Sequence, residues 1–241
     1  MTSQPTTKLS NRLTVLCQAI ASNSFSNPVN VTTKVHDHFD HIWDCCCDHG
    51  YLGQQLLIEQ PESHIHFVDV VPHLIDEVTT RLNTSSEQVN QSNSKWSSHC
   101  MDAAEIPLDS EQSHLVMIAG VGGDLLIEMV ESIVANHPSL MTAGQLSFLL
   151  CPVRQLHKVR EGLNRLNLGL VSEQIVKDKQ LFYEVIMASN QSTTNVSQVG
   201  DSMWDLNNKD HVEYRDTMIK HYSKQPTEQA KSLLALYQGI S

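Results

Sequence analysis

Acidic residues stand at three points of the sequence, each after a short apolar segment. The first point is the heptapeptide Asp44-Cys45-Cys46-Cys47-Asp48-His49-Gly50, and the others are Asp69 and Asp102. Carboxylates attract cationic ligands and accept hydrogen bonds from hydroxyl and amino groups, whereas a phosphate site avoids them. These residue types therefore indicate a ligand that carries positive charge and hydroxyl groups.

In an open α/β sheet, the turn after the first strand approaches the cofactor closely, and an acid that ends the second strand accepts hydrogen bonds from ribose hydroxyls. The heptapeptide and Asp69 occupy these two places. The cationic methyl donor S-adenosylmethionine suits such acids better than a dinucleotide does, and Asp102 is placed to accept from its adenine amino group. Two other interpretations stay open: Asp44 and Asp48 cap the following helix, or Asp69 is a solvated residue at a strand end.

A glycine-rich turn, Ala119-Gly120-Val121-Gly122-Gly123, closes a later strand and opens a helix. Glycine lets the backbone approach a ligand with no Cβ in the way. We therefore predict that this turn forms the floor of the acceptor site. The alternative is a tight turn with no ligand.

The elements that must position these residues follow an alternating pattern from His41 onward, in which short apolar segments are separated by stretches of helical periodicity. This pattern is typical of a mostly parallel sheet with helices on both faces. The last two strands are joined by Asp178-Lys179-Gln180, which is too short for a crossover helix and so predicts an antiparallel pair. The polar stretch 83–94 is predicted to be a loop. We expect a doubly wound α/β fold, a seven-stranded Rossmann-like methyltransferase sheet, with strands at 42–46, 64–70, 96–100, 115–119, 146–151, 170–176 and 182–188.

The ends of the chain differ from this central part. Leu9, Leu13, Leu16 and Ile20 recur at helical spacing and predict an N-terminal helix. Apolar residues near 212–222 and 233–237, separated around Pro226, predict two further helices. The resulting division is an N-terminal helix and loop packing on the core (1–35), a donor-binding domain (36–189), a linker rich in Ser, Thr, Asn and Gln (190–200) and a C-terminal helical extension (201–241).

The net charge of −11 at first disfavours a nucleic-acid partner. The acids crowd residues 37–131, where Arg81 and Lys95 are the only basic residues, so the two ends of the chain are the predicted anion-binding surfaces. No run of 18 apolar residues and no secretory signal is present, and the cysteine spacing is not a disulfide framework. We expect a soluble, cytoplasmic protein with reduced thiols and neither a membrane nor a metal partner.

Two possible metal or redox sites are disfavoured. The histidine- and aspartate-rich segment 36–41 is interpreted as a solvated loop, because ligands two residues apart chelate poorly. Adjacent cysteines in a strand point to opposite faces, so Cys45, Cys46 and Cys47 are interpreted as small thiols in a tight turn.

Four motifs in this order resemble the bacterial tRNA (adenine-22-N1) methyltransferase family, often called TrmK. The resemblance spans about residues 8–189 and implies a class I fold with a small C-terminal helical domain, S-adenosylmethionine as donor and tRNA as partner. It implies transfer of a methyl group to N1 of adenine-22. The motifs are Lys8-Leu9-Ser10-Asn11-Arg12-Leu13, Asp44 to Leu52, Ile118-Ala119-Gly120-Val121-Gly122-Gly123 and Phe182-Tyr183-Glu184-Val185.

The sequence departs from the family pattern at two places. Cys46 stands where the family has a glycine in the first turn, so the turn must accept a Cβ beside the donor. Cys151-Pro152-Val153 stands where the family has Gln-Pro-Asn, which removes an amide that could hold the target base.

Adenine N1 carries a free lone pair, so direct in-line transfer demands orientation and stabilisation of a developing cation more than a general base. Asp48 and His49 are the predicted polar groups near the reacting centre. The predicted donor-binding residues are Asp44, Cys46, Asp48, His49, Gly50, Tyr51, Leu52, Asp69, Val70, Asp102, Ala103, Ala119 and Gly120. The predicted substrate-binding residues are Lys8, Arg12, Val121, Gly122, Gly123, Pro152, Arg154 and Lys158.

Other interpretations of these patterns stay open. The basic helix after Pro152, with Arg154, Lys158, Arg160 and Arg165, either contacts phosphate or is a solvated face. Tyr183 is more often a core residue than a stacking one. At the level of function, the alternatives are a methyltransferase for another RNA, a protein or a small molecule, and a non-catalytic RNA- or partner-binding protein.

Overall fold

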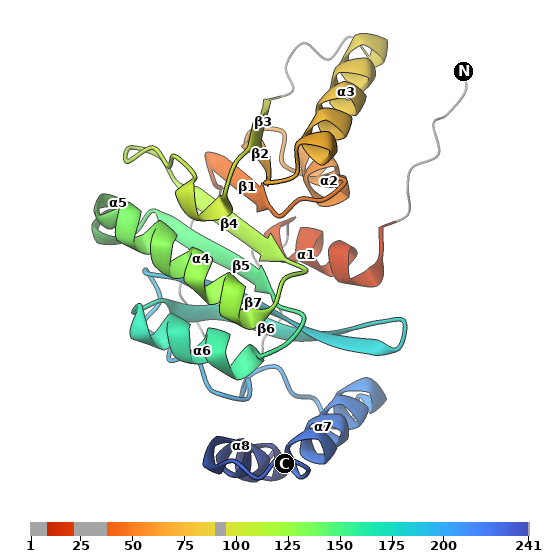
Figure 1. Ribbon diagram of the computed structural model, residues 1–241, viewed down its shortest axis with the longest axis vertical. Helices are drawn as coiled ribbons and strands as arrows, with labels where there is room; N and C mark the ends of the chain where they lie inside the picture. Colours follow the sequence, from red (N-terminus) through yellow and green to blue (C-terminus); the bar gives the residue numbers. More distant parts are fainter. Residues whose placement is uncertain (1–8, 22–37, 90–94, 241) are drawn as a thin grey trace.

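The computed structural model describes residues 9–21, 38–89 and 95–240 (Figure 1). Its seven-stranded sheet has the order β3-β2-β1-β4-β5-β7-β6, in which β7 runs antiparallel to its neighbours β5 and β6 and the other pairs are parallel. The predicted doubly wound, mostly parallel sheet is therefore confirmed. The strands are β1 His41–Cys45, β2 His64–Asp69, β3 Trp96–Cys100, β4 His114–Ala119, β5 Leu146–Cys151, β6 Gly169–Asp178 and β7 Leu181–Ser189.

Helices cover both faces of the sheet, because successive residues of its buried strands point to opposite sides. Trp43 and Cys45 of β1 pack into the cluster beneath α4 and α6, whereas Ile42 packs into the cluster beneath α1, α2 and α3. No described helix is long and apolar enough to cross a membrane. The helices are α1 Asn11–Ala21, α2 Tyr51–Glu59, α3 Pro72–Val89, the 3-10 helix η1 Ala103–Glu105, α4 Gly123–Asn136, α5 Pro138–Ala143, α6 Leu156–Arg165, α7 Lys209–Tyr222 and α8 Glu228–Gln238.

Three local expectations were wrong. α3 continues through 83–89, where a loop was predicted, because extending an existing helix costs far less than starting one. α5 was not predicted at all. β1 ends at Cys45, so Cys46 belongs to the turn rather than to the strand.

The order of the strands switches between β1 and β4. The strands β2 and β3 lie on one side of β1, whereas β4 and β5 lie on its other side. In such sheets, the crevice outside the carboxyl ends of the strands at this switch point is where ligands bind. The first-turn acids and the glycine turn both lie at this edge.

The segment 190–200, expected to be a linker, packs against α6. The Asn164 side chain donates to the Val196 carbonyl (2.7 Å) and accepts from the Val196 amide (3.0 Å). Val196 itself is fully buried. The segment is therefore part of the packed structure, unlike a flexible linker.

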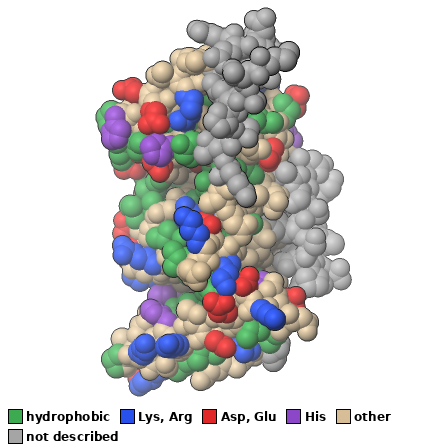
Figure 2. Space-filling view, turned by 90° about the vertical axis from the view of Figure 1, so that its right-hand side faces the viewer, with side chains coloured by type: hydrophobic (Ala, Val, Ile, Leu, Met, Phe, Trp, Pro, Cys, Tyr) green, Lys and Arg blue, Asp and Glu red, His purple; other side chains and the backbone are tan. Residues whose placement is uncertain are grey.

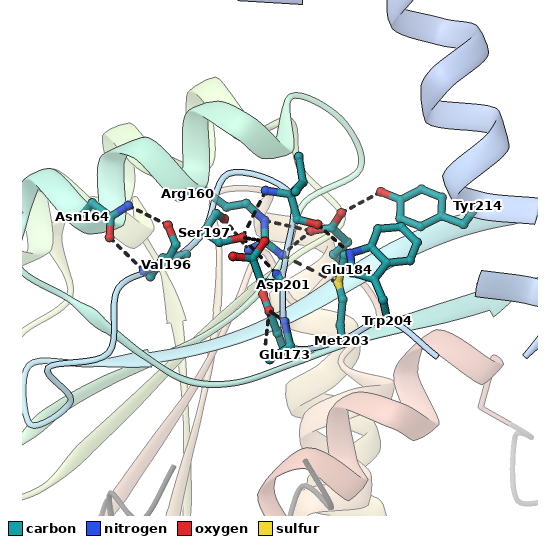
Figure 3. Close-up of polar contacts among 12 residues, drawn as sticks. Arg160, Asn164, Glu173, Glu184, Val196, Ser197, Asp201, Met203, Trp204 and Tyr214 are labelled. Carbon is teal, nitrogen blue, oxygen red and sulfur yellow. Dashed lines mark hydrogen bonds and ion pairs between the residues drawn. The ribbon is translucent and has the colours of Figure 1, made fainter. Parts of the chain in front are cut away.

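A buried ion network joins the sheet to the C-terminal helices (Figure 3). Arg160 of α6 is fully buried and donates to Glu173 Oε2 (2.7 Å) and to Glu184 Oε2 (2.6 Å). It also donates to the carbonyl of Ser197 (2.9 Å), and the Tyr214 hydroxyl of α7 donates to Glu184 Oε1 (2.8 Å). Arg160 is thus unavailable for phosphate, and its inclusion in a basic surface was wrong.

Candidate active site

Asp44 connects β1 to the start of α2. Its side chain is buried and its Oδ2 accepts a hydrogen bond from the Gly53 amide at 2.9 Å. Gly53 lies in the first turn of α2, so the interpretation of Asp44 as a helix-capping residue is correct for this contact. A Cβ on Gly53 would lie 2.9 Å from Phe67 Cζ and 3.0 Å from Asp44 Oδ2, so this position requires glycine. Gly53 was not among the predicted site residues, although its place three residues after Gly50 was the available signal.

The turn between β1 and α2 adopts left-handed backbone at alternate residues. The φ angles are 57° at Cys46, 51° at Asp48 and 64° at Gly50. Aspartate tolerates this conformation, but for cysteine it costs about 1–2 kcal/mol. Cys46 therefore adopts, at a cost in strain, a conformation that favours glycine, the residue that the family resemblance expects there.

Asp69 fixes this turn from β2. Its Oδ2 accepts from the Asp48 amide and its Oδ1 from the Val71 amide, both at 3.0 Å. Each carboxylate oxygen keeps a second lone pair, so the half-buried group can still accept from hydroxyls. The next residue, Val70, is 63% exposed and presents an apolar surface at the end of β2.

Among the remaining predicted donor residues, Asp102 is exposed, whereas Leu52, Ala103 and Gly50 are buried. Asp102 lies at the end of β3, is exposed and accepts from the Ala104 amide at 2.9 Å. Leu52 and Ala103 are buried in the hydrophobic clusters, so their side chains do not reach the crevice. Gly50 packs against the side chains of Val78 and Phe67.

The edge of the sheet at the ends of β1, β2 and β3 is acidic. Burial and the nearby charge of Asp69, opposed by the Gly53 hydrogen bond, raise the pKa of Asp44 to about 7. Burial also raises the pKa of the Cys46 thiol to about 11, with Asp69, Asp44 and Asp102 contributing in the same direction. The thiol is therefore neutral, and the surrounding field favours a cation.

His49 lies on the β2 side of this crevice. Its Nδ1 is 3.4 Å from Glu77 Oε1 of α3, without hydrogen-bond geometry, and its Nε2 is 3.7 Å from Asp48 Oδ1. Arg81 donates to the His49 carbonyl and stacks 5.3 Å from the centre of the Tyr51 ring. The predicted catalytic pair thus adjoins α3, with Asp48 largely exposed.

The glycine turn after β4 is bonded to the turn after β5. The Val121 carbonyl accepts from the Val153 amide (2.9 Å), and the Gly123 amide donates to the Arg154 carbonyl (3.0 Å). A Cβ on Gly123 would lie 2.6 Å from the Gln155 carbonyl oxygen, so this close approach requires glycine. The structure therefore brings the predicted substrate residues Val121, Gly122, Gly123, Pro152 and Arg154 together.

This paired turn combines apolar and basic groups. In the turn after β5, Val153 is 44% exposed and Arg154 is exposed, and Leu125 in the first turn of α4 is 48% exposed. Lys158 is less available, because its Nζ is 2.6 Å from Asp124 Oδ1. Figure 2 shows the side toward which β4 and β5 point: acids and histidines lie around a basic side chain in its upper part, and basic side chains are mixed with acids in its middle and lower parts.

Arg12 reaches the same edge from α1, whereas Lys8 lies outside the described residues. The Arg12 Cζ atom is 4.9 Å from the centre of the Tyr183 ring. Gly120 has a φ of 84°, and a Cβ there would lie 4.0 Å from Arg12 Nη2. Tyr183 packs beside the core under this guanidinium, so it is half-buried rather than a core residue.

The fold and the acidic first turn define a class I methyltransferase-type protein. A family model described as "Methyltransferase domain" matches residues 27–186, and the chain belongs to this family. No curated protein matches the sequence significantly.

Solved structures show the same fold over nearly the whole chain. The M1A22 tRNA methyltransferase TrmK of B. subtilis matches with a TM-score of 0.66 and 19% identity, over 96% of this chain and 94% of that one. M. capricolum TrmK with S-adenosyl-homocysteine matches with 0.70 and 12%, over 97% and 99%. A putative tRNA (m1A22) methyltransferase of Streptococcus pneumoniae with S-adenosyl-L-methionine matches with 0.70 and 16%, over 97% and 98%. The resemblance to TrmK seen in the sequence is thus matched by the fold.

Proposed function

We propose that this protein is an S-adenosylmethionine-dependent methyltransferase that modifies N1 of adenine-22 in tRNA. The observation that carries the proposal is the meeting of two unlike turns at the switch point. The turn after β1 is acidic and suits a cationic donor, and the turn after β4 is glycine-rich and bonded to an apolar, basic ledge. The family match and the donor or product bound in two similar structures support the donor.

The residues present fit the donor. Asp69 offers lone pairs to ribose hydroxyls, Asp102 is placed for the adenine amino group, and buried Asp44 supplies negative charge near the sulfonium. The exposed Val70 gives an apolar contact for the adenine ring. Gly53 and Gly123 keep the two turns close to the crevice.

S-Adenosylmethionine, when bound, supplies the methyl group through its sulfonium. The glycine turn and the ledge formed by Leu125 and Val153 hold the target base flat, so that its N1 lone pair lies in line with the methyl group. Asp44 and the exposed Asp48 provide negative charge near the target adenine of the tRNA, which becomes cationic as the new bond forms. No side chain has to remove a proton, because N1 carries none.

The tRNA substrate rests on the fold shared with TrmK enzymes and on basic groups at the crevice edge, of which Arg154 is exposed. Incubation of the purified protein with labelled donor and unmodified tRNA tests it, with tRNA in which adenine-22 is guanine as the control. We expect label in the first tRNA and none in the second. Equal labelling of both would refute the site assignment.

A methyltransferase for another acceptor is a second candidate, because Val153 replaces the amide that the family places beside the base. Labelling of a non-tRNA fraction of a cell extract would favour it. A non-catalytic binding protein is a third candidate, because Cys46 strains the donor turn. Calorimetry that detects no donor binding would favour it over both enzymes.

A further inference from the structure

The hairpin of β6 and β7 extends past the carboxyl end of the neighbouring strand β5. The last residue pair between β5 and β7 joins Leu150 and Ile186, whereas β6 and β7 stay paired as far as Asp178 and Leu181. The residues 181–185 of β7 therefore lie beyond that last pair, over a length of about 17 Å. Figure 1 shows the hairpin reaching beyond the ends of β4 and β5, between α1 and α7.

Two helices hold this hairpin in place. Lys177 Nζ of β6 is 2.9 Å from Asp210 Oδ1 and 2.7 Å from Glu213 Oε2 of α7. From the other side, the Asn11 side chain of α1 donates to the Lys177 carbonyl at 2.6 Å. The Phe182 ring also stacks on an aromatic ring of α7, with 5.3 Å between the ring centres. The tip of the hairpin is therefore presented at a fixed place.

This place adjoins the glycine turn. Cys151, the last residue of β5, accepts from the Gly120 amide at 3.1 Å. Tyr183 of the hairpin lies 4.9 Å from the Arg12 guanidinium, whose Nη2 would be 4.0 Å from a Cβ on Gly120. Neighbouring strands are about 4.8 Å apart, so β7 lies roughly 10 Å from β4, about three stacked bases across. A base held at the glycine turn therefore has its neighbouring nucleotides beside the hairpin.

The tip itself is apolar and polar side by side. Leu181 is 61% exposed and packs into none of the three hydrophobic clusters of the described residues. Lys179 and Gln180, which precede it in the turn, are exposed as well. Single exposed leucines are common, so it is the position of Leu181 beside the acceptor edge that gives it meaning. A leucine suits the face of a base, and a lysine suits a phosphate.

Methylation at N1 creates a need for such a side chain. N1 of adenine lies on the edge that pairs with another base, so it is covered while the adenine stays in a helix. Enzymes that act on a base take it out of the stack, and apolar side chains inserted between neighbouring bases help to unstack them. The acceptor site of the proposed function therefore requires a group that keeps the adenine apart from its helix.

We propose that Leu181, at the tip of the β6–β7 hairpin, inserts beside the target adenine and holds it out of its helix. This inference rests on the proposed function and names a contact with the acceptor. A protein partner or a membrane would need a larger apolar area than one leucine provides. A single apolar side chain next to the proposed base site is instead the size of one step between stacked bases.

The test compares two tRNAs that differ only in the base facing adenine-22: uridine, which pairs with it, or adenine, which does not. Methylation is measured in a single turnover at saturating tRNA. We expect Leu181→Ser to lower the rate on the paired tRNA roughly 10- to 100-fold and on the unpaired tRNA less than about threefold. Leu181→Phe keeps an apolar side chain and should retain both rates. Ile58→Ser is the matched control, because Ile58 is 74% exposed near the end of α2, at the opposite edge of the sheet, and both rates should stay unchanged.

Four outcomes overturn the inference. Equal losses on both tRNAs in Leu181→Ser mean a general binding contact, and no loss on either means that the hairpin tip is not used. An unaltered protein that methylates the unpaired tRNA alone has no device for unpairing. If Leu181→Ser fails to fold, a full rate of Leu181→Ala on the paired tRNA has the same force. Methylation of neither tRNA by the unaltered protein would instead refute the proposed function itself.

Discussion

The left-handed backbone of Cys46 places a strained residue in the middle of the donor turn. Its φ of 57° is one that glycine adopts freely and that a Cβ makes unfavourable. The thiol is half-buried among carboxylates and stays protonated at neutral pH. Any benefit of the cysteine therefore has to outweigh a conformational cost.

Replacing Cys46 with glycine should stabilise the protein. Removal of the Cβ relieves left-handed strain, and the greater freedom of glycine in the unfolded chain offsets part of the gain, so we expect a rise of about 0.5–1 kcal/mol in the free energy of unfolding. Urea denaturation measures it. Cys46→Ala is the matched control, since it loses the thiol but keeps the Cβ. A gain of the same size in Cys46→Ala would attribute the effect to the thiol.

Asp44 predicts a pH dependence of donor binding. Its pKa of about 7 means that the carboxyl is mostly protonated at pH 6 and mostly ionised at pH 8. A cationic ligand favours the ionised form, so affinity should fall as the pH drops below 7, by up to about tenfold per pH unit. Calorimetry with S-adenosylmethionine, without an acceptor, between pH 6 and 8.5 measures this. Asp44→Asn should bind more weakly and lose this dependence; an unchanged pH profile in that variant would exclude Asp44 as its source.

At the scale of elements, the contact between α6, β6, β7 and α7 depends on charges that water does not reach. Arg160, Glu173 and Glu184 are fully or almost fully buried, and Tyr214 brings α7 into the same network. Buried ion pairs add little over a well-packed apolar alternative, but removal of one partner leaves an uncompensated charge. The network therefore fixes where the C-terminal helices sit more than it adds stability.

Replacing Arg160 with methionine should lower the free energy of unfolding by about 3–5 kcal/mol, because Glu173 and Glu184 would remain buried without a cation. Arg165→Met is the matched control on the same helix: its partner Glu131 is at the surface, so a loss below about 1 kcal/mol is expected. Urea denaturation of both variants gives the comparison. Equal losses would mean that the buried network has no special weight.

At the scale of the whole molecule, a row of histidine side chains beside Trp43 runs across neighbouring strands of the sheet. His66 stacks on Trp43 at 3.7 Å and bonds to His41 at 2.8 Å and to His99 at 3.0 Å. Burial lowers the pKa of His66 to about 2 and that of His114 to about 4, and the other histidines add to this effect. Among the described residues, no group of three such side chains has the arrangement of a metal site. Because burial disfavours the protonated imidazoles, the cluster makes stability depend on pH.

Stability should fall in mild acid. An unfolded histidine binds a proton near pH 6.5, whereas folded His66 does so only near pH 2, so protons favour the unfolded state throughout this interval. Lowering the pH from 7.5 to 5 should cost up to about 2 kcal/mol from His66. Thermal or urea unfolding across this range measures the slope. His66→Gln should flatten it; a slope as steep as in the unaltered protein would assign the effect to other groups.

The sequence by itself determined the sheet, because alternation of apolar strands with helical periodicity and the short 178–180 connection leave few ways to bury the apolar residues. It also located both turns, since acids and glycines after strands have direct local meaning. The sequence did not predict α5 or the extension of α3, because polar composition and local propensity determine the secondary structure of these segments only weakly. Tertiary structure alone decided what the side chains of Arg160, Leu52 and Arg12 contact. Each has a side chain whose role depends on partners far along the chain: two buried glutamates, a hydrophobic cluster, and a glycine and a tyrosine at the ends of other strands. Those partners come together only when the sheet forms.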